Sequence, residues 1–392
     1  MIEKLRILIF IPHFEPGFKF GGPIRSIKAL INLLNNKIQF TVFTSNHDYG
    51  DKVSYSNIMF NKVLRKDDYD IIYYSGGFIG ILMFIKNNYR YDTIYLNSFF
   101  HFRYSIWIIF LKKLRLINNK IVLSPRGEFN EGALNIRRIK KKLFLYFSKG
   151  IHLYKNIVWH ATTNEEVLAI ESIFGDTATI KYAPVLPSAF AFKKDNDKSI
   201  VKKPCDLKLV FLSRISKIKN LDYLLTELFL ISNEVKDTKA NIVLDVFGPI
   251  SDVSFWNECK CIIEANKSNN IKVTYKGEVE YEEVFGILRN YHYWVLPTLG
   301  ENYGQAIADS LVANCPIIIS DKTPWTEDVK RYNLGFVIEL KEHFLKDVIL
   351  ECLNFNNDEY ANYRCNVKSY IDNHLSDEDS IEKNLNIFLD EN

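Results

Sequence analysis

VLPTLGENYGQAIADSLVANCPIIISDKTPW, residues 295–325, is the most informative part of the sequence. An apolar strand ends in a glycine-containing loop, a helix is expected to begin near Tyr303, and a second apolar strand follows at 316–320. Glu301 and Asp309 lie on either side of the junction between loop and helix. Open α/β sheets bind ligands at the carboxyl ends of parallel strands, and the first N–H groups of a helix attract phosphate. The stretch therefore predicts a site in which backbone N–H groups bind a phosphate and carboxylates bind neighbouring hydroxyls, as a nucleotide-sugar would require.

The same alternation of short apolar runs and longer amphipathic stretches extends along the whole chain, which favours parallel sheets with crossover helices. Residues 184–204 break the pattern with three prolines and the run KKDNDK, and are expected to be a linker. The pattern predicts two doubly wound, Rossmann-like α/β domains. Strands are expected near 5–11, 39–44, 70–75, 93–97, 120–124, 157–161 and 179–183 in the first, and near 207–213, 241–247, 271–276, 293–297, 315–319 and 335–338 in the second.

The stretch at 297–320 resembles the donor-site signature of glycosyltransferase family 4, a retaining family with the GT-B fold. Two positions depart from the signature, because Asp309 stands where the family usually has Glu and Asn314 where a Gly often precedes Cys-Pro. The run SDKTPW resembles a branch that builds bacterial surface polysaccharides such as capsule or O-antigen. Taken alone, the stretch could also be an ordinary strand–loop–helix unit with solvated acids. The resemblance rests on Pro297, Thr298, Glu301, Tyr303, Gly304, Asp309, Ser310 and the strand 316–320.

The resemblance implies a GT-B enzyme with its ligand in the cleft between the two domains. Residues 1–187 would form the acceptor side, with the C-terminal helix at 377–392 packing back on it, and residues 205–376 would bind the nucleotide-sugar. The reaction implied is transfer of a sugar, with retention at the anomeric carbon, from a nucleoside-diphosphate-sugar to a saccharide acceptor. The acceptor is expected to be lipid-linked, and cysteines that are expected to be reduced thiols predict a cytoplasmic location.

The stretch FLSRISKIKNLDYLL, residues 211–225, supports this expectation. It resembles the family's basic motif, with Ser213 in place of the first Gly and with Arg214 and Lys219 at the two basic positions. Fixed cations stabilise the charge that builds on a departing diphosphate without reorganising. Two such cations can replace a divalent metal, so we expect no metal and no cofactor. The alternative is surface charge at a helix start, where cations oppose the helix dipole.

Further candidates follow from the resemblance. Glu301 would contact hydroxyls of the donor sugar, the backbone at Asn302, Tyr303, Gly304 and Gln305 would bind sugar or phosphate, and Asp309 would hold the ribose. A Gly-Gly loop before a helix, as at 21–22, faces the diphosphate and the acceptor in family members. A plain turn is the alternative, but the position of the loop after the first strand favours binding. Structural roles are also open for the other candidates, such as pairing of Arg126 with Glu128 or Glu131. Donor-side candidates are thus Gly21, Gly22 and Gly248, and acceptor-side candidates are Lys19, Arg25, His101 and Arg126.

Charge is unevenly distributed although the net charge is only +3. Residues 1–200 carry 29 basic and 16 acidic side chains, and most of the excess lies between Arg103 and Lys155, where apolar and basic residues alternate at helical spacing. Such helices lie on anionic membrane surfaces, which favours peripheral contact with the inner face of the cytoplasmic membrane over nucleic-acid binding. A solvated basic face is the alternative. The six cysteines form no CxxC pair and are expected to be reduced.

Two other functions fit parts of the sequence. A nucleotide-sugar 2-epimerase has the same GT-B fold, although the loop at 301–304 with its paired acids resembles the transferases better. A non-catalytic protein that binds membranes or polyanions would use only the basic stretch. The DxD pattern at Asp68 to Asp70 is the metal motif of another glycosyltransferase fold, but it precedes a strand instead of following one.

Overall fold

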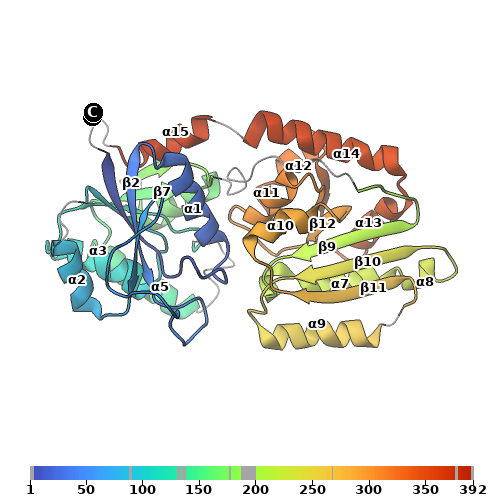
Figure 1. Cartoon of the computed structure of the whole chain (residues 1–392), viewed down its shortest axis with the longest axis horizontal. Coiled ribbons are helices and arrows are strands. Elements are labelled where there is room, and N and C mark those ends of the chain that lie inside the picture. Colours follow the sequence, from blue (N-terminus) through green and yellow to red (C-terminus); the bar gives the residue numbers. More distant parts are fainter. Residues whose placement is uncertain are drawn as a thin grey trace. The chain divides into compact units, whose positions relative to one another are not determined.

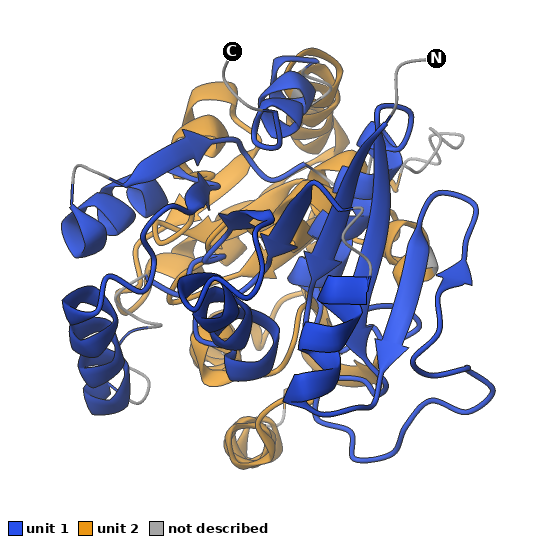
Figure 2. Cartoon of the chain, turned by 90° about the vertical axis from the view of Figure 1, so that its left-hand side faces the viewer, with its two compact units in different colours: residues 1–191, 377–392 blue, residues 192–376 orange. Residues whose placement is uncertain are grey.

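The computed structural model describes residues 4–87, 91–129, 134, 138–175, 178–186, 200–266, 268–375 and 378–389. The chain forms two compact units, one of residues 1–191 and 377–392 and the other of residues 192–376 (Figure 2). Both units are sheets of mostly parallel strands with helices on their faces (Figure 1). Within the described residues, no helix has the length and apolarity needed to cross a membrane.

The sheet of unit 1 has eight strands in the order β3-β4-β2-β1-β5-β6-β7-β8. All neighbours pair in parallel except β3 with β4. The short β3 is the one strand in the described residues that the sequence did not predict. The strands are β1 (Leu5–Phe10), β2 (Ile38–Ser45), β3 (Leu64–Arg65), β4 (Asp70–Tyr74), β5 (Thr93–Leu96), β6 (Lys120–Leu123), β7 (Val158–Ala161) and β8 (Thr179–Tyr182).

Strand β1 shows why its sequence is a continuous apolar run. Leu8 and Phe10 belong to the core on one face of the sheet, whereas Ile7 and Ile9 belong to the core on the other face. Successive strand residues point to opposite faces, so a strand covered on both sides is apolar at every position. The faces are covered by α1 (Gly22–Leu34), α2 (Phe78–Asn87), α3 (Trp107–Lys113), α5 (Arg138–Gly150), α6 (Asn164–Phe174) and α15 (Glu378–Asn386).

The C-terminal segment belongs to unit 1. Ile387 and Phe388 are buried in the same core as Ile7, and the Asn384 side chain donates a hydrogen bond to the carbonyl of Pro184 at 2.8 Å. Lys120 at the start of β6 also donates to the carbonyl of Phe388 at 3.1 Å. Burial of apolar side chains and these hydrogen bonds therefore hold α15 against the sheet of unit 1, which also contains the N-terminal strand β1.

The sheet of unit 2 has six parallel strands in the order β11-β10-β9-β12-β13-β14. The order reverses between β9 and β12, and such a switch point is where open α/β sheets bind ligands. The strands are β9 (Asp206–Leu212), β10 (Asn241–Phe247), β11 (Ile271–Gly277), β12 (Tyr293–Leu296), β13 (Ile317–Ser320) and β14 (Gly335–Ile338). The helices are α7 (Leu221–Leu230), α8 (Ser232–Val235), α9 (Val253–Ala265), α10 (Tyr281–Leu288), α11 (Gln305–Val312), α12 (Thr326–Tyr332), α13 (Phe344–Asn354) and α14 (Asn357–Tyr370).

Candidate functional site

The loops that follow β9 and β12 are joined at the switch point of unit 2. The strands pair directly, with Trp294 opposite Val210. The carbonyl of Ile218 accepts hydrogen bonds from the Thr298 hydroxyl at 2.9 Å and from the backbone N–H of Leu299 at 2.8 Å. The Asn220 side chain returns a hydrogen bond to the carbonyl of Pro297 at 3.0 Å. These bonds fix the two predicted motifs against each other.

This arrangement brings Lys219 and Glu301 into an ion pair. Both side chains are largely buried, with 13% and 11% of their surfaces exposed. The backbone N–H of Glu301 is held by the carbonyl of Lys322 after β13, at 3.1 Å. Two residues that are 82 positions apart in the sequence thus form one charged centre at the carboxyl edge of the sheet.

Arg214 lies on the same edge, directly after β9. Its side chain is half-buried, and within the described part of the chain it makes neither a hydrogen bond nor an ion pair with another residue. Gly248 explains how its backbone is placed, because a Cβ there would lie 2.0 Å from the carbonyl oxygen of Ser213. The close approach and a φ of 131° both require glycine at this position. Gly248 therefore has a structural role beside the predicted contact with the donor.

The loop at 297–304 ends in a left-handed turn at Gly304, whose φ is 80°. Helix α11 begins at Gln305, two residues later than predicted, because this conformation interrupts the helical backbone. Tyr303 is held from outside the loop, since the Trp325 indole donates to its carbonyl oxygen and the two rings contact edge to face. The predicted backbone positions 302–305 therefore form the turn that leads into α11.

Asp309 is fully buried on α11. Its carboxylate accepts a hydrogen bond from the hydroxyl of Tyr281, on α10, at 3.0 Å. Burial, and then the charges of Asp309 and Asp328, raise the pKa of the Tyr303 phenol. The structure thus places Tyr281 next to the acid that was predicted to hold a ribose, a contact that sequence reasoning missed.

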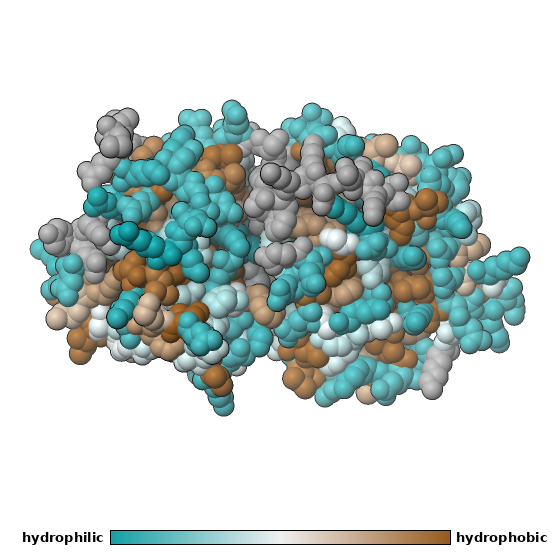
Figure 3. Space-filling view, in the orientation of Figure 1, coloured by the Kyte–Doolittle hydropathy of each residue, from teal (hydrophilic) through white to brown (hydrophobic). Residues whose placement is uncertain are grey.

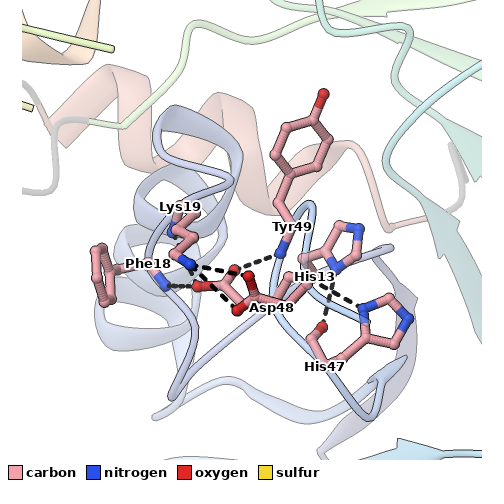
Figure 4. Close-up of polar contacts among 7 residues, drawn as sticks. His13, Phe18, Lys19, His47, Asp48 and Tyr49 are labelled. Atoms are coloured by element: carbon pink, nitrogen blue, oxygen red, sulfur yellow. Dashed lines mark hydrogen bonds and ion pairs between the residues drawn. The ribbon is translucent and has the colours of Figure 1, made fainter. Parts of the chain in front are cut away.

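In unit 1, the Gly-Gly loop precedes α1 as predicted, with Gly21 at a φ of 71° as its N-cap. Asp48 holds this loop, because its carboxylate accepts from the backbone N–H groups of Phe18 at 2.9 Å and Lys19 at 3.2 Å (Figure 4). The Lys19 ammonium pairs with Asp51 at 2.9 Å. Arg25 lies in the first turn of α1. Lys19 therefore reaches an acid of its own unit, although it was predicted to contact a ligand.

Arg126 follows β6 and is engaged within unit 1. Its guanidinium donates to Asn97 at 2.9 Å and to the hydroxyl of Tyr95 at 2.9 Å. The alternative expectation that it pairs with Glu128 is wrong, because Glu128 accepts hydrogen bonds from Ser98 and the backbone of the loop after β5. The other suggested partner, Glu131, lies outside the described residues. The Arg126 side chain is thus positioned by neighbouring strand ends.

The described residues contain no group of three or more His, Cys, Asp or Glu side chains suited to a metal ion. Asp68 lies before β4, and one of its oxygens accepts from the Asn35 side chain at 2.6 Å. The amino end of a strand is the opposite edge from the Gly-Gly loop, so the DxD pattern and that loop lie at opposite edges of the sheet of unit 1.

Comparison with known proteins identifies the class of enzyme. Residues 192–368 match the family model described as glycosyl transferases group 1. The chain is a glycosyltransferase. The match covers most of unit 2, which contains Arg214, Lys219 and Glu301. A search of curated protein sequences returned no match.

Solved structures of similar fold cover nearly the whole chain of this glycosyltransferase. WaaG, a glycosyltransferase involved in lipopolysaccharide biosynthesis, is 13% identical with a TM-score of 0.66, over 99% of this chain and 100% of that one. HepE from Anabaena in complex with UDP-glucose is 12% identical with a TM-score of 0.67, over 98% of each chain. An α,α-trehalose-phosphate synthase (UDP-forming) from Burkholderia xenovorans is 10% identical with a TM-score of 0.69, over 98% of each chain. These likenesses confirm the predicted GT-B fold.

Proposed function

We propose that this enzyme is a retaining transferase that moves a sugar from a nucleoside-diphosphate-sugar to a saccharide acceptor during surface polysaccharide synthesis, with a lipid-linked acceptor. The observation that carries the proposal is the Lys219–Glu301 ion pair at the switch point of unit 2, on the same edge of the sheet as Arg214. The donor class is supported by HepE, solved with UDP-glucose, and the biosynthetic role by WaaG, which acts in lipopolysaccharide biosynthesis.

Each residue has a defined task in this proposal. Arg214 and Lys219 hold the diphosphate, so that the charge released as the glycosidic bond breaks meets cations already in place. Glu301 accepts hydrogen bonds from hydroxyls of the donor sugar while its ion pair with Lys219 keeps the carboxylate oriented. Backbone N–H groups at the start of α11 complete the site for phosphate or sugar. No protein nucleophile is required in this scheme.

The experiment that tests the proposal is a thermal-shift screen with UDP-, GDP- and ADP-sugars, followed by turnover assays with the best donor. A ligand that binds the native state stabilises it by mass action, so the true donor is expected to raise Tm. Product analysis then decides between the candidate functions. Conversion of the nucleotide-sugar to an epimer without an acceptor would identify the epimerase instead, and no stabilisation by any donor would contradict both.

Replacing Asp309 by asparagine is expected to raise KM for the donor several-fold with little change in kcat. Contacts with a ribose are shared by the ground and transition states, so their loss weakens binding rather than chemistry. Asp309→Glu should be tolerated, and Tyr281→Phe serves as the control because it removes one hydrogen bond to the acid and leaves the carboxylate in place. If glutamate abolishes donor binding while asparagine does not, Asp309 is structural.

Transfer activity is expected to persist in EDTA. Arg214 and Lys219 supply the positive charge that a divalent ion provides elsewhere, and both belong to the protein. The measurement is the initial rate before and after chelation. Complete loss of activity that Mn²⁺ or Mg²⁺ restores would contradict the proposal and return attention to Asp68.

Helix α5 supports the proposed contact with an anionic membrane. Ser148 is its one fully buried residue among those described. Large apolar side chains are exposed on it at helical spacing, including Ile139 and Tyr146, each 76% exposed. Apolar patches also interrupt the hydrophilic surface of unit 1 in Figure 3. The rest of the exposed apolar set on α5 is Leu143 and Phe147, and the exposed basic set is Arg138, Lys140, Lys142 and Lys149.

Neutralising the four exposed basic residues of α5 together is expected to reduce binding to anionic vesicles. Each contributes about 1 kcal/mol near such a surface, and added salt should weaken the attraction. Lys141 is left intact because its ammonium lies over the Phe100 ring at 4.6 Å, and Arg137 lies outside the described residues. The measurement is co-sedimentation at low and moderate salt, and turnover of a soluble acceptor should change little.

A matched control neutralises four exposed lysines of unit 2, Lys236, Lys239, Lys260 and Lys272. It removes the same charge from the protein but leaves α5 unchanged. If wild type and the α5 variant sediment equally, or if both variants lose vesicle binding equally, the exposed face of α5 is an ordinary solvated surface.

A further inference from the structure

The segment between β13 and α12 holds the loop that follows β12 at two points. The Lys322 carbonyl accepts from the backbone N–H of Glu301 at 3.1 Å, and the Trp325 indole donates to the carbonyl oxygen of Tyr303. Because β12 and β13 pair directly, each strand of this pair ends beside the loop of the other. Trp325 is the last residue of the run SDKTPW, which has no task in the proposed function.

The position of Trp325 is itself fixed by the helices around it. Its side chain is only 5% exposed, and the residue is the N-cap of α12. The Tyr303 ring contacts it edge to face with 5.4 Å between ring centres, and the Tyr370 ring of α14 lies 6.5 Å from it. The Tyr370 hydroxyl also donates to Asp328 on α12 at 2.6 Å, which joins the two helices. The buried indole is therefore a rigid hydrogen-bond donor.

The bond to the Tyr303 carbonyl determines where the next N–H points. The peptide bond between Tyr303 and Gly304 is trans and planar, so its C=O and N–H point in opposite directions. Since the carbonyl points toward Trp325, the Gly304 N–H points away from it. Among the described residues, this N–H has no acceptor, whereas the Gly304 carbonyl accepts from the N–H of Ile307 at 2.8 Å.

This N–H lies close to the proposed sugar-binding acid. A Cβ added to Gly304 would stand 3.7 Å from Cγ of Glu301, and the φ of 80° favours glycine at this position. Tyr303 and Gly304 are only partly buried, so water could bind the Tyr303 carbonyl without help from the protein. Water would allow the peptide several orientations, whereas a bond from a fixed indole allows one.

We propose that Trp325 is a positioning residue for the donor, which holds the Tyr303 carbonyl so that the Gly304 N–H meets an oxygen of the bound nucleotide-sugar. An N–H can only donate, so the partner is either a phosphate oxygen or a sugar oxygen. Trp325 itself touches no atom of the donor. The proposal rests on the proposed transferase function and adds a residue that acts through the backbone of the site.

The test compares Trp325→Phe with Trp107→Phe. Trp107 is a matched control in unit 1, because its indole also donates to a backbone carbonyl, that of Phe78 at 3.1 Å. The probes are UDP-glucose, UDP-N-acetylglucosamine, GDP-mannose and ADP-glucose. For the probe that wild type binds best, we expect Trp325→Phe to raise Kd and KM about tenfold, the effect of one hydrogen bond to a charged group. Trp107→Phe should change neither constant.

A purely structural role of Trp325 predicts a different result. Loss of packing lowers the amount of folded enzyme, which reduces the apparent kcat but leaves KM unchanged, and denaturant unfolding measures that loss separately. Replacing Trp325 by β-(3-benzothienyl)alanine keeps the shape of the side chain but puts sulfur in place of the N–H, and should raise Kd as much as phenylalanine does. An unchanged KM in Trp325→Phe, equal effects in the two phenylalanine variants, or wild-type affinity with the sulfur analogue would overturn the proposal.

A comparison of two ligands identifies the oxygen that the N–H meets. UDP, GDP and ADP carry the phosphates of the probes without the sugar. If Trp325→Phe weakens binding of the nucleoside diphosphate and of its nucleotide-sugar equally, the partner is a phosphate oxygen. If only the nucleotide-sugar binds less tightly, the partner is a sugar oxygen.

A second measurement uses the wild-type indole as a reporter. The chain has five tryptophans, and the Trp325 signal in a ¹H–¹⁵N spectrum is the indole signal that Trp325→Phe lacks. Hydrogen bonds that share a peptide group polarise one another, so the bound probe should shift this signal and leave that of Trp107 in place. If wild type binds a probe and the Trp325 signal does not move, the positioning role is wrong and the transferase proposal stands. If wild type binds none of the probes, both proposals fail.

Discussion

Replacing Arg214 by alanine is expected to lower kcat/KM for sugar transfer by about thirtyfold to a thousandfold while the fold remains intact. The guanidinium would face the departing diphosphate, and loss of one such fixed group costs on the order of 2–4 kcal/mol of transition-state stabilisation. No hydrogen bond or ion pair with a described residue is lost with it, so the free energy of unfolding should hardly change. The measurement is steady-state kinetics alongside denaturant unfolding.

Lys217 provides the matched control for this variant. It lies three residues further along the same loop, but its ammonium is exposed and pairs with Asp222 at 2.5 Å. Exposed pairs contribute little to stability, so Lys217→Ala should resemble wild type in both measurements. Near-normal turnover by Arg214→Ala, or an equal loss in both variants, would contradict the assignment of Arg214 to the diphosphate.

The strands could be predicted from the sequence because their signal is local. Apolar runs such as those at β1 and β12 are buried on both faces of a parallel sheet, and all thirteen predicted strands are present. The strand that was missed, β3, has two residues and pairs at the edge of the sheet. A run of two residues carries no periodicity that could reveal it.

The spacing of the motifs also predicted that Arg214, Lys219 and Glu301 follow strands, and the structure has them in the loops after β9 and β12. What spacing could not show is which side chains meet across loops. Tyr281 reaches Asp309 from a different helix, and Asn220 reaches Pro297 from a left-handed turn at a φ of 59°. Such contacts depend on the order of strands in the sheet, which a local pattern does not specify.

The direction of a buried acidic side chain is another feature that the sequence does not show. Thr163 caps α6, and Glu166 three residues later completes the sequence pattern of a capping box. The Glu166 carboxylate instead accepts from Thr162 and, at 2.7 Å, from the backbone N–H of Gly127 after β6. A buried acid can accept hydrogen bonds from two loops at once. The sequence shows that the acid is present but does not show toward which loop its side chain points.

Removing either member of the Lys219–Glu301 pair is expected to destabilise the protein and to abolish most activity. Breaking a buried ion pair leaves an uncompensated charge, which costs about 3 kcal/mol. Lys219→Met and Glu301→Gln should therefore each lower the midpoint of denaturant unfolding. Because the two groups interact directly, the stability loss in the double variant should be clearly smaller than the combined losses of the single variants.

Activity should behave differently from stability in this double-mutant cycle. Lys219 is proposed to hold the diphosphate and Glu301 the sugar, so each makes its own contact with the donor. The double variant removes the unpaired charge but restores neither contact. It should therefore recover stability without recovering kcat/KM, as unfolding curves and kinetics measured on the same four proteins can show. If turnover returns together with stability, the pair is structural, and the proposed contacts of both residues with the donor are wrong.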